Sequence, residues 1–143
     1  MRRRTARAFT LLEALIASAV LSLIVLAVGA AVTAGQQASF DARNAVLAAM
    51  AGDDLLADLA AVDYAALSDY DEFSQPLGAI ATLGGRAYPV SYGALGRSVL
   101  VEEVILEEPE TSARIRGKRI VVNVFDAQRV VVTVETFRPE PAP

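Results

Sequence analysis

The stretch that decides the fold is residues 7–34, which read RAFTLLEALIASAVLSLIVLAVGAAVTA. Arg7 is the last arginine of a short basic leader, and Glu13 is the one charged residue between Arg7 and Asp41. The uncharged run that follows Glu13 is 21 residues long, from Ala14 to Ala34. As a helix it would span roughly 32 Å, about the thickness of the hydrocarbon core of a bilayer. The pattern therefore predicts a membrane-spanning helix with one acidic residue near its start.

Glu13 is the first candidate functional residue. A carboxylate beside lipid costs about 2.5–3.5 kcal/mol at the centre of a span and less near its end. An acid kept in such a place is expected to have a role and a cationic partner. The simpler interpretation is a carboxylate at the level of the lipid headgroups that points to water.

Charge is distributed unevenly along the chain. The 143 residues carry 13 basic and 17 acidic side chains, a net charge of −4, but four arginines precede the apolar run. From Phe9 onward nine basic residues face 17 acidic ones, a net charge of −8, which argues against nucleic acid as a partner. The four arginines before the apolar run predict a cytoplasmic N-terminus, with everything after Ala34 on the other side of the membrane.

Composition removes several classes of chemistry. The chain has no Cys and no His, so disulfides are excluded and zinc or iron sites lose their usual ligands. No Gly-x-Ser-x-Gly pattern and no histidine base are present, so we expect no hydrolase and no other enzyme. Nothing in the sequence calls for a cofactor.

The apolar run is expected to continue as one long helix. No proline occurs before Pro76, and a Pro-free segment rich in Ala and Leu favours helix. Beyond the run, apolar residues recur at spacings of four and three, at Leu47, Ala51, Leu55, Leu59 and Val62. We therefore predict a helix from about Phe9 to Val62, apolar all round in residues 9–34 and amphipathic in residues 35–62. Two helices broken near Gly35 are the alternative.

The rest of the chain is predicted to be a loop region followed by a sheet. Residues 63–97 are rich in Gly and Pro and are expected to form loops with short extended pieces such as Ala87–Tyr92. An antiparallel sheet is expected within residues 98–138, with its strands at Ser98–Glu107, Lys118–Phe125 and Arg129–Phe137. The tail from Arg138, above all residues 139–143, is predicted to be disordered.

The last two strands are predicted to form a hairpin. Ile120, Val122 and Val124 share one face of their strand, and Val130, Val132 and Val134 share one face of the next. For both sets to face the same core, we expect Val124 to pair with Val130 across a three-residue loop, Asp126-Ala127-Gln128.

The segment Ala8-Phe9-Thr10-Leu11-Leu12-Glu13, after an Arg-rich leader and before about twenty apolar residues, resembles the processing motif of type IV pilins and type II secretion pseudopilins. The resemblance implies that prepilin peptidase cuts between Ala8 and Phe9, removes the leader 1–8, and that the new Phe9 amine is methylated. It also implies an α+β fold in which a long N-terminal helix packs its second half on a small antiparallel sheet. Two departures stand out, since Ala8 replaces the usual glycine and the apolar segment lacks the proline that major pilins generally carry.

Residues 59–67 and the Val-rich hairpin resemble the minor-pilin and pseudopilin branch. The expected function is a structural subunit at the initiation point or tip of a fibre. The implied partners are other pilin subunits, the peptidase, an inner-membrane assembly platform with its cytoplasmic ATPase, and membrane lipid. The implied location is the bacterial inner membrane, with a single span and a periplasmic C-terminal domain. Type IV pilus, type II secretion and DNA-uptake systems share the N-terminal helix, so the sequence leaves the choice among them open.

Cleavage after Ala8 would create a cationic amine next to Glu13. Phe9 and Glu13 are four residues apart and therefore lie on one helix face. In a low-dielectric setting the amine and the carboxylate are natural counter-ions, within one chain or between neighbouring chains. An ordinary secretory signal cut after Val32-Thr33-Ala34 is an alternative, and its mature protein would begin at Gly35.

Two other charged clusters carry weaker hypotheses. Asp69, Asp71 and Glu72 are candidates for calcium binding, although their spacing matches no complete loop motif and a solvated acidic turn is simpler. An acidic run and a basic run follow, at Glu102, Glu103, Glu107, Glu108 and Glu110, and at Arg114, Arg116, Lys118 and Arg119. These runs are either solvated strand ends with weak salt bridges or a surface that binds a partner. A membrane-anchored or secreted β-rich adaptor that never assembles into a fibre is the alternative function.

Overall fold

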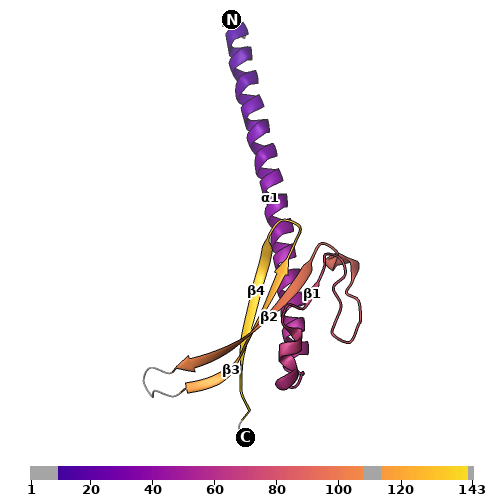
Figure 1. The fold of residues 1–143 in the computed structure, drawn as a ribbon. Coiled ribbons are helices and arrows are strands. Elements are labelled where there is room, and N and C mark those ends of the chain that lie inside the picture. Colours follow the sequence, from indigo (N-terminus) through magenta and orange to yellow (C-terminus); the bar gives the residue numbers. More distant parts are fainter. Residues whose placement is uncertain (1–9, 108–113, 142–143) are drawn as a thin grey trace, which may run out of the picture. The chain divides into compact units, whose positions relative to one another are not determined.

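The computed structural model describes residues 10–107 and 114–141. Their elements, in chain order, are α1 (Leu11–Ala60), η1 (Ala65–Tyr70), β1 (Ser74–Gln75), η2 (Val90–Tyr92), β2 (Gly96–Glu107), β3 (Arg114–Phe125) and β4 (Val130–Pro139). This is the α+β architecture that the sequence predicts, with a long N-terminal helix and an antiparallel sheet (Figure 1). The chain divides into two compact units, Met1–Asp41 and Ala42–Pro143.

The described part of the first unit is helical from Leu11 onward, and all of its side chains are exposed. The helix runs through Gly29 and Gly35 without a break, so the single-helix prediction is confirmed. By length and composition it is able to cross a membrane. Three hydroxyl groups donate to the carbonyl oxygen four residues earlier at 2.8–3.0 Å, from Ser18, Ser22 and Thr33. These bonds satisfy hydroxyl donors that a hydrocarbon environment would leave unpaired.

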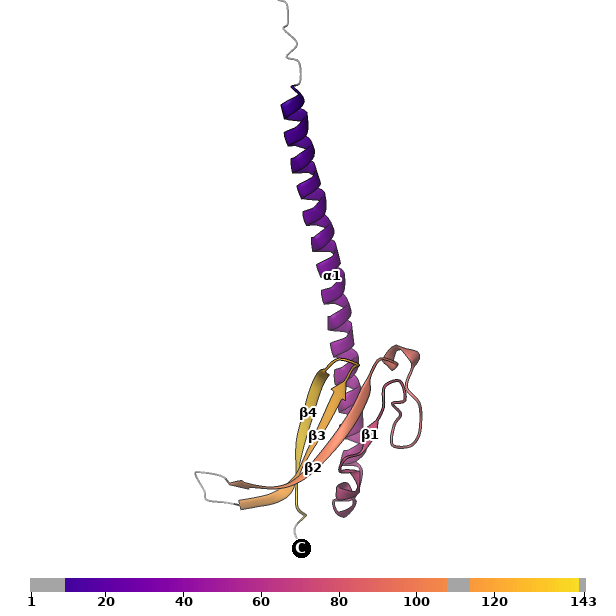
Figure 2. The same ribbon diagram turned by 45° about the horizontal axis from the view of Figure 1, so that its top comes forward.

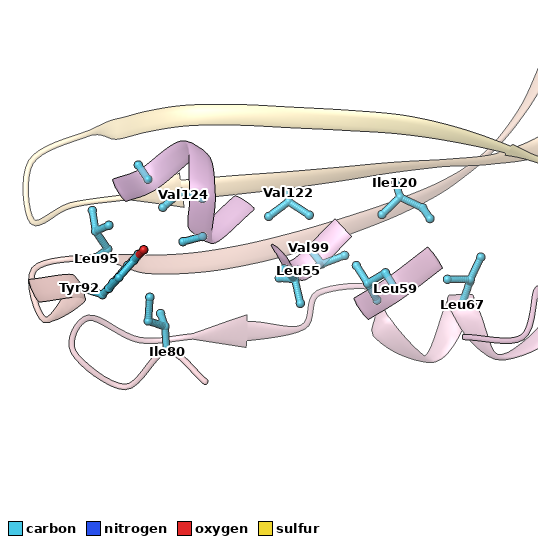
Figure 3. Packing of buried hydrophobic residues seen from close by; sticks show 12 residues of the cluster. Leu55, Leu59, Leu67, Ile80, Tyr92, Leu95, Val99, Ile120, Val122 and Val124 are labelled. Atoms are coloured by element: carbon cyan, nitrogen blue, oxygen red, sulfur yellow. The ribbon is translucent and has the colours of Figure 1, made fainter. Parts of the chain in front are cut away.

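The second unit packs the last part of α1 on a four-stranded antiparallel sheet of order β1-β2-β3-β4. Ala51, Leu55 and Leu59 are completely buried, and Leu47 and Val62 are half-buried beside them, so the predicted apolar stripe is confirmed. Figure 3 shows the leucines of the helix facing the valines of the sheet. Burying each such leucine contributes about 1.5–3 kcal/mol, which fixes the helix on this face.

All three predicted strands are present, and the sheet extends beyond them. β3 begins at Arg114 rather than Lys118, because Arg114–Gly117 pair with the far end of β2. β4 stops pairing where Pro139 lies opposite Gly117. Beyond that point β2 and β3 continue as a two-stranded ribbon, visible in Figure 2.

The predicted register of the closing hairpin is wrong. Phe125, not Val124, pairs with Val130, and a bulge between Val124 and Phe125 brings Val124 opposite Val132. The loop has four residues because Asp126 organises it: the carboxylate accepts the backbone N–H of Gln128 at 2.8 Å and that of Arg129 at 2.9 Å. The bulge adds one residue, which offsets the even-numbered loop and keeps Val132 and Val134 on the core side. Val130, which was also expected to face the core, is exposed.

The prediction of a disordered tail from Arg138 onward is also wrong for its first residues, since Arg138 and Pro139 belong to β4. The Glu140 N–H donates to the Arg116 carbonyl at 2.9 Å. Residues alternate along a strand, so the nitrogen of Pro139 points away from β3, where a missing N–H leaves no ladder bond unmade. Residues 142–143 lie outside the described residues.

The connecting region 63–97 is mostly irregular, as predicted, but Ala87–Tyr92 is not an extended piece. Val90–Tyr92 form the 3-10 turn η2, and Ala87 alone makes an isolated bridge, to Ala81. Pro89 begins the turn, with its carbonyl accepting the Tyr92 N–H at 3.0 Å. Its ring fixes φ in the range that starts a turn.

Candidate functional site

The candidate assembly site lies at the N-terminal end of α1. Ala8 and Phe9, where the sequence predicts cleavage and methylation, lie outside the described residues. The described part of the site begins at Thr10 and includes Glu13, which lies in the first turn of the helix.

Thr10 and Glu13 form a reciprocal cap. The Thr10 hydroxyl oxygen accepts the Glu13 backbone N–H at 3.2 Å. In return, Glu13 Oε2 accepts the Thr10 backbone N–H at 3.2 Å and the Thr10 hydroxyl at 3.1 Å. This arrangement is a capping box, which satisfies donors that the first turn of a helix leaves without partners.

The cap determines how the carboxylate is presented. Both Thr10 donors reach the same oxygen, Oε2, and no described residue donates to Oε1. The side chain is folded back toward the start of α1, and the partial positive charge of the helix N-terminus also favours an anion there. The site therefore offers one carboxylate oxygen to a cation.

Sequence reasoning missed the role of Thr10, although a signal was present. Thr10-Leu11-Leu12-Glu13 fits the Ser/Thr-x-x-Glu pattern that precedes an apolar helix.

One residue of the acidic cluster proposed for calcium, Asp71, has a structural role instead. Asp71 Oδ1 accepts the backbone N–H of Val101 at 3.0 Å and so covers part of the outer edge of β2. Glu72 has a positive φ of 61°, and Asp69 is exposed. Within residues 10–107 and 114–141, no group of three or more acidic side chains is arranged to hold a metal ion.

The acidic and basic runs face each other across β2 and β3, as strand ends. Glu102 lies opposite Arg119 and Glu107 opposite Arg114, and each pair forms an exposed salt bridge, the second at 2.6 Å. The hydrogen bond to Glu102 raises the pKa of the Arg119 guanidinium. Exposed pairs of this kind contribute little to stability, because water screens them. Glu108 and Glu110 lie outside the described residues.

Lys118, which shares its strand face with Ile120, is buried rather than solvated. Its Nζ donates to the Tyr64 carbonyl at 2.8 Å and lies 4.6 Å from the centre of the Tyr64 ring. The ammonium therefore keeps a hydrogen bond and a cation–π contact away from water.

Arg97 is a second buried cation that the sequence reasoning missed, and it is completely inaccessible to solvent. Its guanidinium donates to three acceptors, the Ala51 carbonyl at 2.8 Å, Gln75 Oε1 at 2.7 Å and the Ala81 carbonyl. These bonds join α1, β1 and the connecting region. Arg97 shares its strand face with Val99 and Val101, so alternation along the strand was the signal that could have placed it inside.

Tyr88 completes this network. Its ring lies 5.2 Å from the Arg97 guanidinium carbon, and its hydroxyl donates to Asp54 Oδ2 at 2.9 Å. Burial raises the pKa of the Tyr88 hydroxyl, and the hydrogen bond to Asp54 raises it further. The network is a structural clamp between α1 and the connecting region.

Comparison with known proteins finds one match, and it covers the N-terminal site. Residues 3–34 match the family model described as the prokaryotic N-terminal methylation motif. No curated protein and no solved structure matches the chain. The matched segment contains Thr10, Glu13 and the predicted cut, so the chain carries a prepilin-type motif, consistent with a type IV pilin or pseudopilin.

Proposed function

We propose that the chain is a minor pilin or pseudopilin, cut between Ala8 and Phe9 and assembled at the initiation point or tip of a type IV pilus or type II secretion pseudopilus. The observation that carries the proposal is the isolated Glu13 carboxylate, which is held at the start of an apolar helix within the matched motif. The α+β fold with its long helix supports the same assignment.

The mechanism we propose is electrostatic. Removal of residues 1–8 takes away all four leader arginines and leaves an α-amine on Phe9. When a subunit joins the fibre, this amine meets the Glu13 carboxylate of a neighbouring copy, and the ion pair sets the axial register between them. Deleting one partner of a buried pair costs about 3–5 kcal/mol, because the remaining charge is left without a counter-ion. An unprocessed or misplaced subunit is therefore rejected.

The remaining features of the proposal follow from the apolar helix and the motif. Before assembly, the subunit is a single-pass protein of the inner membrane, with its N-terminus cytoplasmic and the unit Ala42–Pro143 periplasmic. Its partners are the peptidase, other pilin subunits, the assembly platform and membrane lipid. A minor rather than a major subunit is favoured because the apolar segment contains no proline. We propose no enzymatic activity.

The proposal is tested by replacing Glu13 with Ala and measuring incorporation into fibres by crosslinking through introduced cysteines, since the chain has none of its own. We expect the Glu13→Ala chain to be processed and inserted, and its incorporation to fall at least a hundredfold, as the loss of about 3 kcal/mol requires. Asp41→Ala is the matched control, because it removes an exposed carboxylate farther along the same helix. Normal incorporation of Glu13→Ala would rule out the ion pair.

A further inference from the structure

We propose that the outer edge of β2, from Glu103 to Glu107, binds an extended segment of a partner protein as an additional antiparallel strand. The segment that fits carries an apolar residue between two basic ones, in the pattern basic-x-apolar-x-basic. This inference goes beyond the proposed function, because a strand edge can pair with a partner whether or not the chain enters a fibre.

Hydrogen bonds near the start of β2 show which backbone groups face this edge. The N–H groups of Val99 and Val101 donate toward the side of β1, to the Phe73 carbonyl at 2.8 Å and to Asp71 Oδ1 at 3.0 Å. In an antiparallel sheet, backbone groups point to the two sides of a strand in alternation, so every second residue after Val101 faces the same side. These residues are Glu103, Ile105 and Glu107. Within the described part of the chain, no strand pairs with this edge beyond Asp71, and such an edge is a template for another strand.

The far end of the sheet is one strand short. Beyond Gly117 only β2 and β3 continue, as the ribbon seen in Figure 2. A two-stranded ribbon is marginally stable in water, and a third strand is normally needed. Large apolar side chains of this ribbon are about half exposed, 49% for Ile105, 49% for Leu106 and 47% for Ile115. A third strand would have to pair with β2, because the Glu140 N–H already bonds to the β3 edge at the Arg116 carbonyl.

The side chains along the edge select the chemistry of the added strand. Glu103, Ile105 and Glu107 share the strand face of Val101, since alternate residues of a strand point to one face. In the described part of the chain no cation is bonded to Glu103, and the salt bridge of Glu107 to Arg114 is exposed. Opposite charges directly across a strand pair are stabilising, and like charges are destabilising. The fitting strand therefore places Lys or Arg opposite both glutamates and an apolar residue between them.

The same charges disfavour a second copy of this chain as the occupant. Two β2 edges paired antiparallel about Ile105 would set Glu103 of each copy opposite Glu107 of the other, which is a repulsive arrangement. The basic strand end of a second copy is a poor partner as well, because Glu140 occupies the edge of β3 at Arg116. The edge therefore favours a different protein with its own basic segment.

The experiment measures the binding of end-blocked, fluorescently labelled peptides to the full-length chain in detergent micelles by fluorescence anisotropy. The probe is Thr-Thr-Lys-Thr-Val-Thr-Lys-Thr-Thr, which places both lysines and the valine on one face of a strand. The control, Thr-Thr-Thr-Lys-Val-Lys-Thr-Thr-Thr, has the same composition but places its lysines on the opposite face from the valine. We expect the probe to bind about tenfold more tightly, as three favourable cross-strand pairs allow. Equal affinity of the two peptides would overturn the inference.

Variants of the chain separate the charges from the backbone of the edge. Glu103→Gln should weaken probe binding about threefold, the factor for one cross-strand pair, and Glu135→Gln, at an exposed position of β4, should leave it unchanged. Ile105→Pro removes an N–H that faces the edge and should weaken binding at least tenfold, whereas Ile105→Thr keeps the N–H and should stay within about threefold. Unchanged hydrogen exchange of the Ile115 N–H, which faces β2, shows that the ribbon of the proline variant is intact. Equal binding by Ile105→Pro and Ile105→Thr would contradict strand addition.

A modified probe tests the pairing without changing the chain. Methylation of the backbone nitrogens of the valine and both lysines keeps the charges but removes the donors that face β2, so binding should fall at least tenfold. Hydrogen exchange of the Ile105 and Glu107 N–H groups locates the site, and we expect fast exchange in the chain alone and at least tenfold slower exchange with saturating probe. Binding of the methylated probe as tight as that of the unmodified one would overturn the inference. Slow exchange of these two groups before any probe is added would also overturn it, because the edge would then already be covered.

Discussion

At the residue scale, the second unit is held together by cations on the inner face of the sheet. Arg97 bonds to α1, β1 and the connecting region. Lys118 and Arg138, opposite one another in β3 and β4, donate to carbonyl oxygens at and beyond the end of α1. The last carbonyls of a helix have no partners within it and lie at the negative end of its dipole, so cations are the donors best suited to them.

Replacement of Arg97 by leucine should destabilise this unit strongly. The change leaves the carbonyls of Ala51 and Ala81 and the side chain of Gln75 without their donor. A buried polar group without a partner costs about 1–3 kcal/mol, so we expect a loss of about 3 kcal/mol or more in the free energy of unfolding. Urea unfolding of the detergent-solubilised chain, followed by tyrosine circular dichroism, measures it. Arg97→Lys, which keeps the charge and some donors, should lose less, and a wild-type midpoint for Arg97→Leu would contradict the clamp.

Asp126 should make the stability of the hairpin depend on pH. The backbone N–H groups of Gln128 and Arg129 lower the pKa of its carboxyl below the ordinary value of 3.8. Because the folded pKa is the lower one, the unfolded state binds the proton more readily, and the stabilisation is complete above the ordinary pKa. It is lost as the pH falls through the lowered folded pKa.

We therefore expect Asp126→Ala to melt at a lower temperature than the wild type at pH 6. The gap between the two melting temperatures should shrink as the pH is lowered from about 4 toward 2. Thermal unfolding at a series of pH values checks this. A gap that stays constant across that range would show that the charge of Asp126 is not what organises the loop.

At the element scale, the regular parts of the fold were predictable and the irregular parts were not. The course of α1 follows from a Pro-free run and an apolar stripe, which are properties of neighbouring residues. The strands follow from alternation, which also predicts that Val122 and Val124 face the core. The hairpin register does not follow from alternation, because backbone hydrogen bonds to the Asp126 carboxylate select a four-residue loop. The bulge then returns Val132 and Val134 to the core side.

Gly117 of β3 lies tightly against β4, and Gly117→Ala should weaken the pairing of the two strands. A methyl group there would lie 2.4 Å from Cζ of Phe137 and 2.5 Å from the carbonyl oxygen of Arg138. The Phe137 ring can turn away, but the carbonyl oxygen is part of the strand and cannot move without bending it. We expect a loss of about 1–3 kcal/mol, the usual cost of overpacking.

Hydrogen exchange of the backbone amides of β4 measures the weakening of this pairing. Gly84→Ala in the connecting region is the control, because the added methyl group would meet only the Thr82 hydroxyl at 3.8 Å, an ordinary contact distance. Unchanged protection of the amides between Thr133 and Arg138 in Gly117→Ala would contradict the prediction.

At the scale of the whole molecule, the α+β class could be predicted because hydropathy separates the apolar run from the Val-rich sheet. The path of the connecting region could not, because it depends on the tertiary bonds of Arg97 to Gln75 and Ala81. The candidate site could be proposed from the sequence because it is local: the processing motif and its acid lie within a few neighbouring residues. Its cap through Thr10 was equally local, and its pattern was present in the sequence.

In the proposed mechanism, the chain is matured at Ala8–Phe9 so that a new amine can meet Glu13. The most direct measurement is the N-terminal mass of the protein isolated from cells with an active prepilin peptidase. Maturation as proposed predicts a chain that begins at Phe9 and carries one methyl group on its amine. A chain that still begins with its arginine leader, or one that begins at Gly35, would contradict it.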